Sequence, residues 1–109
     1  MAGGDDLRRI ALSFPGVVEA PHFDRRAFKG RVTFATLAAD GLSANFRFSF
    51  EDQQLKCAVA PEAFAPLPNA WGRQGWTEGR LAALTDAELR AALEVAWRES
   101  QRKPPRKRR

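Results

Sequence analysis

The clearest hydrophobic pattern lies near the C-terminus, where apolar residues recur with the period of an α-helix. They occupy positions i, i+3, i+4, i+7 and i+8: Leu89, Ala92, Leu93, Ala96 and Trp97. A capping box, Thr85 to Glu88, precedes them. We therefore expect a helix that ends near Arg102, before Pro104-Pro105. Shorter helices are expected over residues 5–13 and, with Ser49 as the cap, over residues 49–58.

Between the helices the pattern changes to the alternation that is typical of half-buried strands. It is clearest over residues 42–48, where apolar and polar residues alternate. Further strands are expected near residues 17–18, 27–28 and 76–81, and over residues 31–37, where Val32, Phe34 and Thr36 should share one face. Residues 59–70 contain three prolines and predict an extended loop anchored by Phe64 and Leu67.

The order of these elements predicts the fold class. A helix, several strands, a second helix, another strand and a final helix indicate an α+β protein with two layers, in which helices pack on one face of an antiparallel sheet. A chain of 109 residues has room for one such domain.

The charge is unevenly distributed along the chain. It holds 18 Lys+Arg against 13 Asp+Glu, and six of the basic residues fall within the last eight: Arg102, Lys103, Arg106, Lys107, Arg108 and Arg109. Residues 1–101 therefore contain 12 basic and 13 acidic residues and are close to neutral. We expect a domain over residues 1–101 and a disordered basic tail over residues 102–109.

Several classes of protein are disfavoured by what the sequence lacks. One cysteine cannot form an internal disulfide, and one Cys with one His cannot supply the four ligands of a structural zinc site. Common phosphate-binding, serine-hydrolase and zinc-protease motifs do not occur. The acidic N-terminus leads into no apolar run, so neither secretion nor membrane insertion is expected. We expect a cytoplasmic protein that is a monomer and needs no metal or cofactor.

The tail is the most direct electrostatic feature. Six closely spaced cations can displace counterions from the phosphates of DNA or RNA without a defined structure of their own. Two other interpretations remain open: a solvated segment that keeps a nearly neutral domain soluble, and a signal for targeting or for docking to a partner protein.

A second basic group consists of Arg25, Arg26, Lys29 and Arg31. These residues flank a predicted Lys29-Gly30 turn, so they are expected at a hairpin tip that could contact phosphates. Hairpin tips are also charged simply because solvent surrounds them. Phe28, which lies between these cations, is expected to pack inward.

The segment from Trp71 to Trp76 has glycines at positions 72 and 75. The favoured interpretation is a tight turn whose two tryptophans cover the sheet. Two alternatives remain: a shallow ligand pocket formed by Trp71, Trp76 and either Arg47 or Arg73, and a backbone clamp like the Gly-x-x-Gly loop of KH domains. Arg73 is also a candidate contact for nucleic acid.

Few residues could carry catalysis. A dyad could be drawn between His22 and Cys57, but we expect His22 to be packed and hydrogen-bonded and Cys57 to be a small buried hydrophobe. Glu51 and Asp52 are better explained as charges in the first turn of a helix. We therefore do not expect an enzyme.

Several motifs together resemble the MmcQ/YjbR family. They are residues 13–19 (SFPGVVE), His22-Phe23, residues 28–31 (FKGR) and, above all, residues 68–77 (PNAWGRQGWT). The resemblance covers residues 5–101 and implies a small frataxin-like domain. Members are described as DNA-binding proteins with a double-wing arrangement. Gly79 departs from the family pattern, which usually has an apolar residue there; the glycine either weakens its strand or leaves room for a neighbouring ring.

The frataxin-like fold raises the question of iron. Frataxins bind it with an acidic ridge on the first helix, but here only Asp5 and Asp6 are available, beside Arg8 and Arg9. We therefore do not transfer iron binding to this chain.

The leading hypothesis is weak, largely sequence-independent binding of nucleic acid through the tail and the hairpin. The alternative is a module that binds a protein or a small ligand through the Trp71/Trp76 surface.

Overall fold

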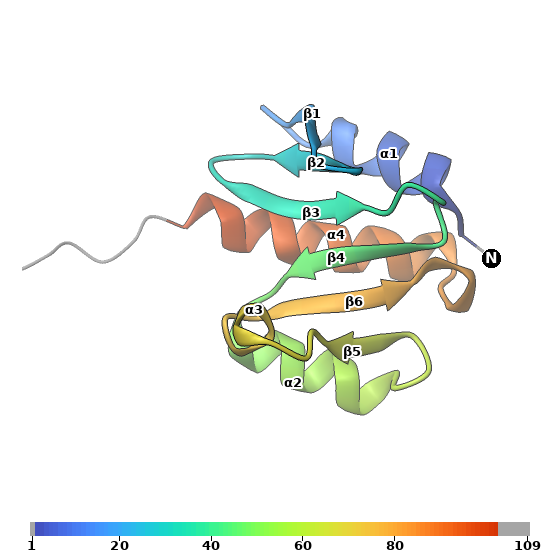
Figure 1. The fold of residues 1–109 in the computed structure, drawn as a ribbon, viewed down its shortest axis with the longest axis vertical. Coiled ribbons are helices and arrows are strands. Elements are labelled where there is room, and N and C mark those ends of the chain that lie inside the picture. Colours follow the sequence, from blue (N-terminus) through green and yellow to red (C-terminus); the bar gives the residue numbers. More distant parts are fainter. Residues whose placement is uncertain (1, 103–109) are drawn as a thin grey trace, which may run out of the picture.

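The computed structural model describes residues 2–102 and confirms the predicted α+β class (Figure 1). Six strands form one antiparallel sheet, and helices pack against it. In chain order the elements are α1 (Gly4–Ser13), β1 (Val18–His22), β2 (Arg25–Lys29), β3 (Thr33–Leu37), β4 (Ser43–Arg47), α2 (Phe50–Val59), β5 (Phe64–Pro66), α3 (Ala70–Arg73), β6 (Trp76–Arg80), a short 3-10 turn (Leu81–Ala83) and α4 (Asp86–Gln101).

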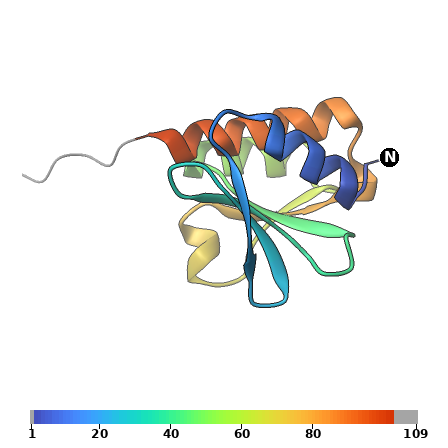
Figure 2. The ribbon, with the colours of Figure 1, turned by 90° about the horizontal axis from the view of Figure 1, so that it is seen from above.

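The sheet and the helices form two layers. The strand order is β1-β2-β3-β4-β6-β5, so β1 and β5 are the two edges. In Figure 2 the helices α1, α2 and α4 lie together on one side of the sheet, whereas α3 and the β1–β2 hairpin project on the other side. We call the side away from α1, α2 and α4 the open face.

The strand register decides which side chains lie on each face. Phe28, Ala35, Phe46 and Thr77 are consecutive cross-strand partners, and all four are buried on the helix-covered face. Their neighbours along each strand point to the open face. The alternation predicted for the fourth strand is thus confirmed, although the strand begins at Ser43 and leaves Leu42 exposed.

A β-bulge in β3 overturns the predicted alternation over residues 31–37. Ala35 pairs with Phe28 while Thr33 pairs with Lys29, so Phe34 is an extra residue without a partner on β2. Phe34 and Ala35 are consequently both buried in the core, and Thr33 and Thr36 both line a pocket on the open face. The expectation that Phe34 and Thr36 share one face was wrong, because a bulge shifts the period-2 pattern by one residue.

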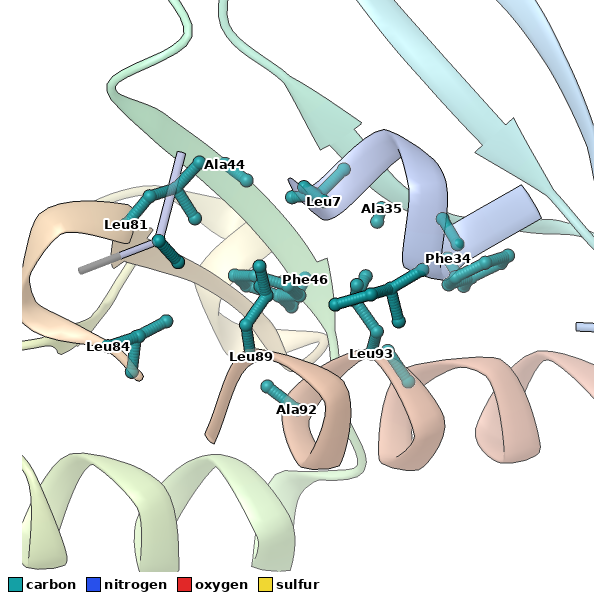
Figure 3. Packing of buried hydrophobic residues seen from close by; sticks show 14 of the residues in the cluster. Leu7, Phe34, Ala35, Ala44, Phe46, Leu81, Leu84, Leu89, Ala92 and Leu93 are labelled. Atoms are coloured by element: carbon teal, nitrogen blue, oxygen red, sulfur yellow. The ribbon is translucent and has the colours of Figure 1, made fainter. Parts of the chain in front are cut away.

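The core lies between the sheet and α4. Leu89, Ala92 and Leu93 of α4 face Phe34 and Phe46 of the sheet, and Leu7 of α1 completes this cluster (Figure 3). All six side chains are fully buried. The capping box of α4 also forms as predicted, since Thr85 accepts a hydrogen bond from the Glu88 backbone and Glu88 accepts one from the Thr85 backbone.

The proline-rich segment after α2 is more ordered than the sequence predicted. It forms the edge strand β5 and the one-turn helix α3 instead of an extended loop throughout. Phe64 is buried and Leu67 half-buried, so both predicted anchors are confirmed. The sequence pattern did not predict this strand, because it has only three residues and ends in a proline, which an edge strand tolerates.

Gly79 leaves space for a neighbouring aromatic ring. A Cβ at this position would lie 2.6 Å from Cε2 of Phe46 and 3.3 Å from Cε1 of Phe64. The Phe46 ring is fully buried and packs against Phe48 and Phe64, so it cannot move aside easily. The second of the two explanations for Gly79 is therefore correct.

We predict that Gly79→Ala destabilises the fold by about 1–3 kcal/mol, because the added methyl group overpacks the Phe46 ring. The midpoint and slope of urea unfolding measure this change. Glu78→Ala, at the exposed neighbouring position of the same strand, is the control and should stay within about 0.5 kcal/mol of the parent. Equal stability of Gly79→Ala and the parent would contradict the packing described here.

Candidate functional site

A pocket of about 320 Å³ lies on the open face, between the β1–β2 hairpin and α3. This volume is at the lower end of the range that is typical of ligand sites, about 300–1,000 Å³. Residues from five strands, from α3 and from the segment before it line the pocket: His22, Arg25, Thr33, Thr36, Asn45, Leu67, Trp71 and Trp76. No carboxylate lines it; Glu78, the cross-strand partner of Asn45, lies beyond its rim. We call it the open-face pocket.

Arg25 supplies the positive charge of the open-face pocket and is held in place by Thr36. Its Nε donates to Oγ1 of Thr36 at 2.9 Å, and its Nη2 donates to the Thr36 carbonyl at 3.2 Å. Thr36 is on the neighbouring strand and is almost fully buried. The guanidinium group is therefore fixed against the sheet, while three of its five N–H groups remain available.

The two tryptophans reach the open-face pocket through a tight chain reversal. Asn69 caps α3 by accepting a hydrogen bond from the Trp71 backbone. Gly75 then adopts a φ of +103°, and a Cβ there would lie 1.9 Å from the Phe48 carbonyl oxygen. At Gly72 a Cβ would lie equally close to the Leu67 carbonyl oxygen. The glycines thus permit the predicted turn, and α3 rules out a KH-like loop between two helices.

A buried glutamine of α2 holds the chain reversal between Trp71 and Trp76 in place by hydrogen bonds. Gln53 of α2 is 2% exposed, and its Nε2 donates to the Gly72 carbonyl at 2.9 Å and to the Trp76 carbonyl at 3.1 Å. The hydroxyl of Thr77, which is fully buried, donates to the Gly75 carbonyl at 3.0 Å. Because these side chains add a second hydrogen bond to each of three carbonyl groups, the backbone of α3 and of the start of β6, which carries Trp71 and Trp76, is held in place.

The structure places both tryptophans of the hypothesised ligand pocket at one cavity, with a different arginine beside them. Trp71 and Trp76 line the same pocket, as the alternative hypothesis required. Arg47 is the cross-strand partner of Trp76 but, like Arg73 on α3, it lies outside the lining. Arg25 takes the place expected for these two residues. No sequence pattern indicated this, because Arg25 and Trp76 are far apart in the sequence. They lie on β2 and β6, which β3 and β4 separate in the sheet.

His22 is not the packed, hydrogen-bonded histidine that the sequence predicted. It is exposed at the end of β1, contacts Phe23 edge-to-face with ring centroids 4.9 Å apart, and makes no hydrogen bond through its side chain within residues 2–102. The cause is the tight turn at Phe23-Asp24, which places both aromatic residues at the tip of a hairpin.

Phe23 is the most exposed large hydrophobic residue of the described chain. It is 95% exposed and has a φ of +58°, a conformation that is strained for a bulky residue. A hairpin turn with positive φ at its first residue favours glycine there. An exposed ring in a strained turn beside the open-face pocket is a candidate contact for a ligand or partner.

The four basic residues that were predicted at one hairpin tip lie near opposite ends of β2. Lys29 and Arg31 flank the turn at Gly30, as expected, but Arg25 and Arg26 begin β2 at the opposite end, about 13 Å away. The placement of all four residues at one tip was therefore wrong. Phe28 packs inward and is fully buried, as predicted.

Arg26 is further separated from Arg25 because it lies on the other face of the sheet. Its Nε donates to Glu19 at 2.7 Å, and Arg8 of α1 donates to the second oxygen of Glu19, also at 2.7 Å. Partial burial raises the pKa of Glu19, but the hydrogen bonds from Arg26 and Arg8 outweigh it, and the net pKa is lowered. Arg26 is thus neutralised, and Glu19 ties α1 to the edge of the sheet.

The two sides of the molecule differ in how their cations are used. On the helical side, five cations each form an ion pair: Arg8, Arg9, Arg26, Arg98 and Arg102. Lys56 of α2 and Arg90 of α4 form none within residues 2–102. On the open face, no ion pair is recorded within residues 2–102 for a second set of cations: Arg25, Lys29, Arg47, Arg73 and Arg80. The strands of the open face carry one carboxylate, Glu78, against these five cations, so the face has an excess of positive charge.

The candidate dyad of His22 and Cys57 does not form. His22 lies on the edge strand β1, and Cys57 lies on α2 beside the opposite edge, a distance on the order of 20 Å. Cys57 is half-buried against the core, and burial raises the pKa of its thiol. Among residues 2–102 no cluster of three His, Cys, Asp or Glu side chains is arranged to hold a metal ion.

Most of the predicted tail lies outside the described residues. Lys103 and Arg106–Arg109 belong to that part. Arg102 is described: its backbone caps α4, and its side chain pairs with Glu99 at 3.3 Å.

In the described part of the chain no helix is long and apolar enough to cross a membrane.

The comparisons with known proteins place the fold in a family. A family model described as YjbR matches residues 12–99, which contain all six strands and most of α4. The chain belongs to the YjbR family. This confirms the resemblance predicted from the Trp71–Trp76 segment and its neighbours. No curated protein matches this YjbR-family chain.

A solved structure supports the same fold. The DR2400 protein of Deinococcus radiodurans, described as carrying a DUF419 domain, superimposes with a TM-score of 0.73. The match covers 89% of this YjbR-family chain and 77% of the other chain, at 20% sequence identity. The similarity therefore concerns the fold, and function has to be argued from the open face itself.

We predict that Glu19→Gln lowers the free energy of unfolding at pH 7 by on the order of 1 kcal/mol, since the exposed parts of both arginines limit the effect. The pKa of Glu19 is lowered in the fold, so its contribution is complete above the ordinary glutamate pKa and is lost as the pH falls through the lowered value. Urea unfolding of parent and variant should therefore converge below about pH 4. A difference that stays constant from pH 7 to pH 3 would refute this role.

Proposed function

We propose that the chain binds nucleic acid weakly, and with little dependence on base sequence, through the open face of its sheet. The observation that carries this proposal is the division of charge. Five of the seven cations on the helical side are paired with carboxylates, the exceptions being Lys56 and Arg90, whereas the five on the open face have no such partner within residues 2–102. Unpaired arginine and lysine side chains on one surface are what a phosphate backbone requires.

Aromatic residues on the same face support this proposal. Trp71 is 57% exposed, Trp76 is half-buried, and Phe23 projects from the hairpin tip. Neither tryptophan takes part in an aromatic pair among the described residues. Surfaces that combine cations with available aromatic rings are typical of proteins that contact bases without reading their sequence.

The basic tail of the sequence follows a helix that ends beside the β2–β3 turn. The Arg31 backbone N–H donates to the side chain of Gln101 at 3.0 Å, so the β2–β3 turn lies against the C-terminal end of α4. In the sequence, further basic residues follow α4, from Lys103 to Arg109. We propose that they supplement the open face in binding phosphates. This retains the tail hypothesis and assigns the main contact to the domain.

Binding rather than catalysis is part of the proposal. The separation of His22 from Cys57 and the raised pKa of the Cys57 thiol support it. The open-face pocket also lacks a carboxylate that could act with His22 as an acid–base pair.

A second candidate function is recognition of a protein partner or a small ligand by the Trp71/Trp76 surface. The exposure of Phe23 and Trp71 favours it, because large exposed aromatic residues often mark interfaces. Salt dependence separates the two candidates. Binding to phosphates weakens steeply with salt, whereas an apolar interface changes little.

We predict that Arg47→Ala weakens binding of a labelled oligonucleotide several-fold and reduces the slope of log K against log salt by about 0.7–0.9, the value of one lost phosphate contact. Arg90→Ala is the matched control. It removes the same charge from the exposed side of α4 and should change neither quantity. Fluorescence anisotropy over a salt series measures both.

A chain ending at Gln101 completes this experiment. Salt-sensitive binding that survives the truncation locates the main contact on the domain, as proposed, and complete loss would assign it to the tail instead. If neither chain binds single-stranded or duplex DNA at low salt, nucleic-acid binding is refuted.

We predict that Phe23→Gly raises the free energy of unfolding by on the order of 1 kcal/mol, because glycine adopts the positive φ without strain, yet weakens binding to the oligonucleotide because the ring is lost. Phe23→Ala is the control: it removes the ring but keeps the strain, so it should weaken binding without stabilising the fold. Unchanged affinity in both variants would show that the exposed ring plays no part in binding.

A further inference from the structure

The open-face pocket combines features that no other part of the described structure brings together. It has one fixed cation, two tryptophans from different elements and several polar groups without protein partners. We infer that it is a subsite for a single unpaired nucleotide, with the base against the tryptophans and the phosphate on Arg25. This inference rests on the proposed function and deepens it, since it specifies single-stranded rather than duplex nucleic acid.

Arg25 has the geometry of an anion-binding group. Its hydrogen bonds to Thr36 use Nε and one N–H of Nη2, so the Nη1 side of the guanidinium group remains available to a phosphate. No ion pair of Arg25 is recorded within residues 2–102, and no carboxylate lines the cavity. A half-buried cation that is positioned but not neutralised favours an anionic ligand at this point.

Trp71 and Trp76 offer aromatic surface to a flat ligand. Trp76 lies on β6 and Trp71 on α3, so the two indoles approach the cavity from the sheet and from the helix beside it. The hydrogen bonds of Gln53 hold both segments, which reduces the cost of ordering the rings when a ligand binds. Stacking on such rings tolerates any base, in agreement with weak sequence dependence.

Polar groups around the cavity can complete the contacts of a nucleotide. The amide of Asn45, the imidazole of His22 and the hydroxyl of Thr33 make no side-chain hydrogen bond that the structure records within residues 2–102. These groups include both donors and acceptors, as the edge of a base and a phosphate together require.

The position of the cavity argues for an unpaired base. It lies between α3 and the β1–β2 hairpin, which both project on the open side of the sheet (Figure 2). In a duplex each base is stacked on both faces and paired along its edge, so it cannot reach the tryptophans. An unpaired base can leave the stack and enter the cavity.

A calorimetric titration at low salt tests the subsite directly. Adenosine 5′-monophosphate, adenosine and inorganic phosphate are titrated separately into the full chain. The monophosphate should bind at least tenfold more tightly than either fragment, because only it reaches both Arg25 and the tryptophans. Equal or weaker binding of the monophosphate would overturn the inference.

Variants of the pocket give the second arm of the test. Arg25→Gln should reduce affinity for the monophosphate at least tenfold, and Trp71→Ala should reduce it several-fold. Arg90→Gln, on the far side of the molecule, should have no effect. Because Trp71 is largely exposed, its loss should leave the fold intact, and urea unfolding of each variant verifies this. Unchanged affinity in both pocket variants would refute the subsite.

Oligonucleotides separate the failure of the subsite from the failure of the proposed function. A single strand should bind several-fold more tightly than the duplex of the same sequence, and Arg25→Gln should abolish this preference. If the pocket variants bind both forms like the parent while Arg47→Ala weakens both, the subsite is wrong and the open-face function stands. If no oligonucleotide binds but the monophosphate binds through Arg25, the pocket is a site for a free nucleotide and the proposed function is wrong.

Discussion

The β-bulge at Phe34 is the constraint on which both faces of the sheet depend. An unbroken alternation in β3 would place Phe34 and Thr36 on the same face. Either Phe34 would then be exposed on the open face, or Thr36 would be buried in the core. The extra residue sends Phe34 and Ala35 to the helices and Thr33 and Thr36 to the open face. Thr36 can then hold Arg25 across the strand pair. One irregularity thus completes the core and positions the charged group of the pocket.

Helices cover only one side of the sheet. The ion pairs that join the elements of the fold lie on the covered side, whereas the proposed binding residues lie on the other side. On the covered side, each arginine near α1 and the sheet edge is matched by a carboxylate: Glu19 joins Arg8 and Arg26, and Asp86 joins Arg9. These pairs link α1 to the β1–β2 hairpin and to α4. Within residues 2–102, the cations of the open side have no such partners and its two tryptophans have no aromatic partners. An excess of cations without carboxylate partners on one face favours an anionic ligand there.

The open-face pocket depends on close backbone packing at one end of the sheet. Gly72 and Gly75 approach the Leu67 and Phe48 carbonyl groups so closely that no side chain fits there, and Gln53 donates hydrogen bonds to the Gly72 and Trp76 carbonyl groups of the same segment. A buried glutamine on a helix with little hydrophobic periodicity could not be identified as a positioning residue from its sequence context. Its role depends on α2 lying beneath the Trp71–Trp76 segment, which is a consequence of the strand order.

The sequence by itself determined the local structure: the capped helices, the alternation in β4, the tight turn between the tryptophans, the α+β class and the family. These follow from interactions between residues close along the chain, which periodicity, capping residues and glycines report directly. Only the tertiary structure decided that Arg25 rather than Arg47 or Arg73 joins the tryptophans, that Arg26 is neutralised on the opposite face, and that His22 is exposed. Each of these outcomes depends on strand order and register, which are set by packing between distant segments.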